Sequence, residues 1–135
     1  ILTHQNNKAY FDRAFAAKRT ISPDALAKSK KKANVRGVGD KYVHTDGNRT
    51  VEMHTIKGNI HNDSLMMVWL PKEKILVQAD VFGPLPPGAK PPAKPNPVLA
   101  NFVENMERLK IVPERIANIH GGVVPVAELN RALGK

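Results

Sequence analysis

Residues 65–80 read Leu-Met-Met-Val-Trp-Leu-Pro-Lys-Glu-Lys-Ile-Leu-Val-Gln-Ala-Asp. Two apolar runs, Leu65–Leu70 and Ile75–Ala79, flank the four residues Pro71-Lys72-Glu73-Lys74, and this pattern predicts a β-hairpin. Both runs are almost continuously apolar, which is typical of strands that are covered on both faces. The segment therefore predicts the centre of a layered domain.

The flanking sequence predicts alternating strands and helices. Upstream, Asp46-Gly47 is a strong tight-turn signal between the predicted strands Tyr42–His44 and Thr50–Ile56. The periodicity of the remaining segments predicts a strand stub at Ile1–Thr3, helices at Lys8–Ala17 and from Ser22, a helix at Asn101–Lys110, a strand at Arg115–Ile119 and a final helix at Val126–Leu133. We expect a single α/β domain over residues 1–135, with a mixed sheet covered by helices on one face.

A proline-rich segment, Gly83–Pro97, follows the hairpin directly, with prolines at positions 84, 86, 87, 91, 92, 95 and 97. Proline cannot donate to a β-ladder or continue a helix, so we expect an extended loop. Such a loop is usually a stiff spacer, and placed after a metal ligand it could also form the rim of a pocket.

Composition narrows the function classes. The chain has 41% hydrophobic residues and no cysteine, which excludes disulfides, thiolate ligands and cysteine nucleophiles. The first residues carry no signal-peptide pattern, and no apolar run approaches the roughly 20 residues that span a bilayer. The net charge of +9 comes partly from a basic run, Lys28–Arg36. This run fits a solvated loop better than a nucleic-acid surface, because no aromatic residues are interleaved with it.

Three residues stand out by position: His61, Asp80 and His120. Asp80 ends the second hairpin strand, and pairing the hairpin about Pro71–Lys74 places Leu65 opposite it, with His61 a short loop away. His120 ends a later predicted strand and precedes Gly121-Gly122. Strand ends are where open α/β sheets place their sites.

Imidazole and carboxylate groups together suit zinc, and also iron or manganese. A carboxylate can bridge two ions, and two ions can share one nucleophilic hydroxide. The spacing alone equally fits a capping or surface aspartate and two loop histidines.

The ordered set Gly58-Asn59-Ile60-His61-Asn62-Asp63-Ser64, Leu70–Asp80 with its Leu-Pro-Lys-Glu-Lys turn, and Ile119-His120-Gly121 resembles the later motifs of the metallo-β-lactamase superfamily. The resemblance implies half of a four-layer αββα sandwich. It also implies two zinc ions in the complete fold: His61 would bind the first, His120 the second, and Asp80 both. A metal-bound hydroxide would attack an ester, lactone, amide or β-lactam carbonyl of a small-molecule substrate.

The superfamily's first motif, His-x-His-x-Asp-His, is not in the sequence. We therefore expect the chain to be the C-terminal half, inactive by itself and with little or no bound metal. Its partner would be the missing N-terminal half or a second copy of the chain. The proline-rich stretch resembles periplasmic or secreted members, and this favours that location. Two alternatives remain open: a non-catalytic half-fold that dimerises through its sheet, and an RNA-processing member of the fold.

Other residues have subsidiary expectations. Asp63 could accept a hydrogen bond from His61, since ligand imidazoles usually donate to a carboxylate or a carbonyl. His4 could order the rim of the site. We expect His54 to be structural and Trp69 to belong to the core.

Overall fold

The computed structural model describes all residues from Ile1 to Lys135. The chain forms two compact units, residues Ile1–Gly39 and Asp40–Lys135, and each is described by itself. None of the helices combines the length and the apolar character that are needed to cross a membrane.

The first unit is a small α/β element. It contains β1 (Leu2–His4), a 3-10 turn η1 (Gln5–Asn7), α1 (Lys8–Ala16), α2 (Ala25–Ser29) and β2 (Arg36–Val38). The two strands pair in parallel, with Leu2 opposite Arg36. Strand β2 was not predicted, because its glycine suggested a loop. A Cβ atom at Gly37 would require the side chain of Gln5 to move.

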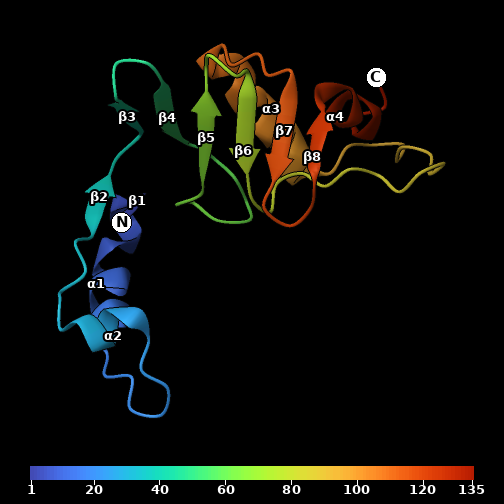
Figure 1. Ribbon diagram of the computed structural model, residues 1–135. Coiled ribbons are helices and arrows are strands. Elements are labelled where there is room, and N and C mark those ends of the chain that lie inside the picture. Colours follow the sequence, from blue (N-terminus) through green and yellow to red (C-terminus); the bar gives the residue numbers. More distant parts are fainter. The chain divides into compact units, whose positions relative to one another are not determined.

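The second unit is built on a six-stranded mixed sheet (Figure 1). Its strands lie in sequence order, β3 (Lys41–Thr45), β4 (Thr50–Thr55), β5 (Met66–Leu70), β6 (Ile75–Gln78), β7 (Arg115–Asn118) and β8 (Val123–Pro125). All neighbours pair antiparallel except β6 and β7, which are parallel. The hairpin register, with Leu70 opposite Ile75 and Val68 opposite Val77, is the predicted one.

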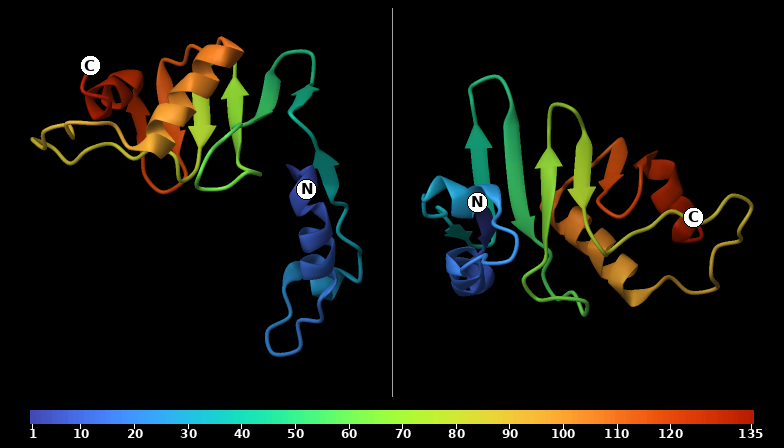
Figure 2. Two further views of the ribbon diagram at one scale, coloured as in Figure 1. Left: turned by 180° about the vertical axis from the view of Figure 1, so that it is seen from behind. Right: turned by 60° about the horizontal axis from the view of Figure 1, so that its bottom comes forward.

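Two helices pack on one face of this sheet. Helix α3 (Pro97–Leu109) runs across the strands (Figure 2), and α4 (Val126–Ala132) follows β8. The core between the helices and the sheet contains side chains that are almost inaccessible to solvent: Ile56, Met67, Leu76, Phe102, Ile116 and Leu129. Trp69 packs against the same core, as expected. The predicted α/β class and the helix-covered mixed sheet are confirmed.

The opposite face of the sheet carries an apolar row. Strand pairing puts Met53 opposite Val68, Val68 opposite Val77, and Val77 opposite Ala117. These side chains are partly exposed, and no helix of residues 40–135 lies on this face (Figure 2). The near-continuous apolar pattern of the hairpin is thus matched by a helix layer on one side only within this unit.

The start of helix α3 and the presence of strand β8 are the main differences from the sequence predictions in this unit. Helix α3 begins at Pro97, not at Asn101, because Asn96 Oδ1 accepts a hydrogen bond from Val98 N and proline fits the first helical position. The last residue of the proline-rich segment is thus helical. Strand β8 was not predicted, since its three residues carry too short a pattern.

Burial of the Ile116 side chain should contribute strongly to the free energy of unfolding of this unit. Ile116→Ala removes a fully buried side chain, and we expect a loss of about 2–5 kcal/mol. Val112→Ala, at a residue that is 76% exposed, should change stability by less than about 0.5 kcal/mol. Urea unfolding followed by far-UV circular dichroism checks both; equal midpoints would contradict the assigned core.

Candidate metal centre

Three loops meet at one edge of the sheet: the loop before β5, the loop after β6 and the loop after β7 (Figure 1). The parallel pairing sets two of them. Gln78 lies opposite Asn118, so Asp80 and His120 each follow the last paired residue of their strand by the same interval. The hairpin sets the third, because its register continues toward Leu65, a short distance after His61.

The structure brings His61, Asp80 and His120 together. His120 Nε2 lies 3.0 Å from Asp80 Oδ1, and His61 Nε2 lies 3.7 Å from Asp80 Oδ2. The two imidazoles thus face different oxygens of one carboxylate. All three side chains remain partly exposed, at 48%, 40% and 71% for His61, Asp80 and His120, so the group is open to solvent.

Asp80 has a left-handed backbone, with φ +68°. This conformation is costly for most residues, though aspartate and asparagine tolerate it better than others. The side chain of Gln78 holds the turn: its Nε2 donates to Phe82 O at 2.8 Å, and its Oε1 accepts from Val81 N at 3.2 Å. Backbone strain that neighbouring hydrogen bonds maintain is common at functional sites.

Asparagines fasten the His61 loop to helix α3. Asn59 Oδ1 accepts from His61 N at 3.0 Å, and Asn59 Nδ2 donates to Asn101 Oδ1 at 3.0 Å. Asn105, only 3% exposed, donates to Lys57 O and accepts from Lys57 N. This network was not predicted. The available signal was the pair Asn101 and Asn105, one turn apart on the buried side of a helix, where asparagine is unfavourable without a partner.

The His120 loop is fixed in a similar way. Asn118 Nδ2 donates to Gly122 O at 2.9 Å, and Asn118 also bonds to the Gln78 side chain across the parallel pair. Ile119 N donates to Gln78 O at 3.0 Å. The turns that carry Asp80 and His120 therefore share one buried amide pair, Gln78 and Asn118.

The residues with subsidiary expectations lie as follows. Asp63 Oδ1 accepts a hydrogen bond from Ser64 Oγ at 3.0 Å, and Asp63 makes no hydrogen bond to His61. His4, in the first unit, accepts from Asn6 N through Nδ1 and begins the 3-10 turn. Their proposed roles at the centre stay predictions.

His54 is a structural histidine by its surroundings. It is 3% exposed, and its Nε2 lies 2.8 Å from Glu52 Oε2. Burial acts to raise the pKa of Glu52, but hydrogen bonds from Lys41 and His54 outweigh it and hold that pKa below its usual value. This cluster belongs to strands β3 and β4 and is separate from the candidate centre.

The donor types of this group suit a metal ion. Two imidazole nitrogens and one carboxylate are the donor types that zinc, iron and manganese accept. No three His, Cys, Asp or Glu side chains are placed to hold a single ion together. Asp80, facing one imidazole through each oxygen, can supply one ligand to each of two ions. Each ion would then have two ligands from this chain, whereas catalytic zinc usually has three from protein.

Neither a family model nor a curated protein matches the chain, but solved structures match over almost its whole length. Rubredoxin oxygen:oxidoreductase from Desulfovibrio gigas is 19% identical with a TM-score of 0.64, over 99% of this chain and 35% of its own. The metallo-β-lactamase superfamily protein ST1585 from Sulfolobus tokodaii is 18% identical with a TM-score of 0.62, over 98% and 56%. A metallo-β-lactamase from Pontibacter korlensis is 16% identical with a TM-score of 0.58, over 98% and 55%.

The chain has the metallo-β-lactamase fold. It spans between about a third and just over half of the length of the structures that it matches. The fold expected from the motifs around His61, Asp80 and His120 is confirmed. At these identities the likeness establishes the fold and not the activity, because this fold, like others, can host different chemistries.

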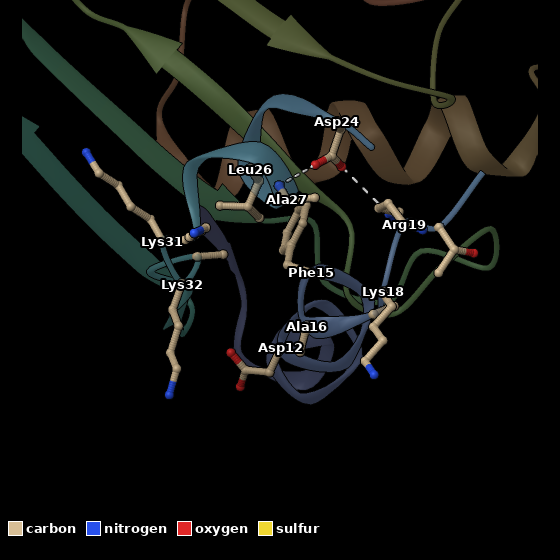
Figure 3. A pocket seen from close by; sticks show the side chains of 14 residues that line it. Asp12, Phe15, Ala16, Lys18, Arg19, Asp24, Leu26, Ala27, Lys31 and Lys32 are labelled. Carbon is tan, nitrogen blue, oxygen red and sulfur yellow. Dashed lines mark hydrogen bonds and ion pairs between the residues drawn. The ribbon is translucent and has the colours of Figure 1, made fainter. Parts of the chain in front are cut away.

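Part of the basic run of this metallo-β-lactamase-fold chain, Lys30–Lys32, lines one side of a pocket in the first unit (Figure 3). Phe15 and Leu26 lie close together in it, while Lys31 and Lys32 extend away into solvent. Asp24 accepts from Ala27 N at 2.8 Å and lies 3.6 Å from Arg19 Nε. Lys31 and Lys32 are exposed, and whether the basic run binds nucleic acid stays a prediction.

The strain at Asp80 gives a direct test of the site's backbone. Asp80→Ala keeps the unfavourable left-handed residue without the tolerance of aspartate, so we expect a loss of about 1 kcal/mol. Asp80→Gly removes the same carboxylate but relieves the backbone, and should be neutral or stabilising. Thermal unfolding of both variants measures the difference. Equal effects would show that the backbone at this position is unstrained.

Proposed function

We propose that this chain is the C-terminal metal-binding part of a zinc-dependent hydrolase that cleaves an ester, lactone, amide or β-lactam in a small molecule. The observation that carries the proposal is the position of His61 Nε2 and His120 Nε2 on different oxygens of Asp80, at 3.7 and 3.0 Å. In this proposal His61 and His120 each bind one ion and Asp80 binds both.

The chain's own residues would act mainly by position. Asn59 and the Gln78–Asn118 pair hold the backbone of the three loops, so the backbone positions of the ligand residues are set before any ion binds. Fixed ligands reduce the reorganisation that binding requires. When bound, two zinc ions supply a nucleophile from water at neutral pH and stabilise the oxyanion of the attacked carbonyl.

The same proposal requires a second half. Two ligands per ion are one fewer than catalytic zinc usually takes from protein. The chain also covers only 56% of the Sulfolobus tokodaii structure and 55% of the Pontibacter korlensis structure. The apolar row of Met53, Val68, Val77 and Ala117 also lacks a helix layer in its own unit. A missing N-terminal half that supplies ligands and covers this face answers both requirements.

Metal identity separates hydrolase from oxidoreductase chemistry. Rubredoxin oxygen:oxidoreductase shares the fold, and imidazole with carboxylate also suits iron. Native mass spectrometry with elemental analysis of the complete protein gives the chain mass and the bound metal together. We expect about two zinc ions per chain in a protein longer than residues 1–135; two iron ions would redirect the proposal to redox chemistry.

His120→Ala in the complete protein tests the ligand assignment. We expect a loss of about one zinc ion per chain and a fall in ester or lactone hydrolysis of at least about a hundredfold, since the variant removes a ligand. His44→Ala is the matched control, because His44 is an exposed strand residue with no place in the centre. Unchanged zinc content and activity in His120→Ala would refute the assignment.

A second candidate is a non-catalytic half-fold that dimerises through its open sheet face. The apolar row favours it, because a contiguous apolar surface requires a cover. Sedimentation velocity of the 135-residue chain over a hundredfold dilution should then show a reversible dimer, and Val68→Lys should abolish it. A monomer at all concentrations would exclude this candidate and leave the hydrolase proposal intact.

A further inference from the structure

A pocket of about 470 Å³ opens beside His61, Asp80 and His120. No lysine, arginine or glutamate lines it. Its walls away from the three site residues are mainly apolar and include Val81, Phe82, Leu85, Pro92, Val98 and Leu99. A pocket of this size with few polar groups is typical of a small-molecule site.

Two side-chain amides, Gln78 and Asn96, lie in the wall. Gln78 bonds with Phe82 O, Val81 N and the Asn118 side chain. Asn96 Oδ1 accepts from Val98 N at 2.8 Å and begins helix α3. A ligand would therefore meet polar partners at the His61–Asp80–His120 end and at Asn96 Nδ2, and mainly apolar side chains elsewhere.

Part of the apolar wall comes from the proline-rich loop, which supplies Leu85 and Pro92. Arg131 of helix α4 fastens this loop: its guanidinium donates to Leu85 O at 2.6 Å and to Ala89 O at 3.0 Å. Glu128 Oε2 accepts from the same guanidinium at 2.9 and 3.1 Å. The bond to Leu85 O fixes the backbone of a residue whose side chain lines the pocket.

We propose that this pocket receives an apolar portion of the substrate, such as an alkyl or acyl chain, and that Arg131 is a positioning residue for its Leu85 wall. Calling the ligand a substrate rests on the proposed function, but binding of an apolar ligand to this pocket can be tested without catalysis. Burial of one methylene stabilises binding by roughly fourfold, so affinity should rise with chain length until the pocket is filled.

The binding experiment uses neutral probes, the primary amides from acetamide to hexanamide, with the 135-residue chain. Methyl-labelled NMR should show shifts at Leu85, Val98 and Leu99, and an affinity gain of roughly threefold to fourfold per methylene. Shifts elsewhere only, or an affinity independent of length, would overturn the inference.

Arg131→Gln tests the positioning role. It keeps a hydrogen-bonding side chain but cannot reach both carbonyls with a charged fork, so we expect the gain per methylene to fall below about twofold while acetamide binding is unchanged. Arg131→Lys should restore part of the gain. Lys94→Gln, an exposed residue of the same loop, is the matched control. Equal weakening of all amides in Arg131→Gln would indicate a general structural effect and refute the positioning role.

A second measurement separates this inference from the proposed function. The complete, metal-loaded protein is assayed with p-nitrophenyl acetate and p-nitrophenyl hexanoate. Hydrolysis with a higher kcat/KM for the hexanoate supports both proposals. Hydrolysis without chain-length preference overturns the apolar subsite and leaves the hydrolase. Length-dependent amide binding without any hydrolysis supports the subsite and overturns the hydrolase.

Discussion

The parallel pairing of β6 with β7 is the constraint on which the candidate centre depends. These strands are adjacent in the sheet but separated in sequence by the proline-rich loop and helix α3. Their register puts Gln78 opposite Asn118, and both strands end at the same edge. Asp80 and His120, each two residues after the last paired residue of its strand, therefore lie next to each other at that edge. A shift by one residue would reverse the face of every side chain on the shifted strand, so the buried Leu76 and Ile116 protect the geometry of the site as well as the stability of the core.

Much of this arrangement could be predicted from the sequence, because it follows from short-range patterns. The turn at Pro71–Lys74 determines the hairpin register, and that register alone places Asp80 near the start of β5, where His61 lies. The missed features depend on contacts over long sequence distances. The asparagine network of the His61 loop joins Asn59 to Asn101, and no local periodicity marks such a pair. Pro97 appeared to belong to the loop, because the proline that begins a helix looks the same in sequence as the prolines that precede it.

The support of the His61 backbone shows what sequence reasoning could not find. Proximity in sequence suggested that Asp63 supports His61, yet its carboxylate accepts from Ser64 Oγ, and the backbone of His61 is held by Asn59. The neutral amide of Asn59 can hold the His61 backbone because it accepts from a loop N–H and donates to a helix side chain at the same time. A carboxylate only accepts. Sequence reasoning that looks for charged partners around a metal ligand will therefore overlook the amides that hold its backbone.

The open edge and the open face of the second unit have a common physical origin. A sheet with helices on one side leaves its other apolar face for a partner layer, and in a fold made of two similar layers the ligands at the edge come from both. Under the proposed hydrolase function, the two ligands per ion and the apolar row at Met53, Val68 and Val77 would have one cause, a partner layer that completes both. The apolar pocket is different, because its walls and its Arg131 anchor all lie within residues 40–135. If a partner layer completes the metal ligands, the proposed selectivity for an apolar group would come from residues of this chain. In that case both halves would supply metal ligands, and the apolar pocket described here would be formed by residues of this half.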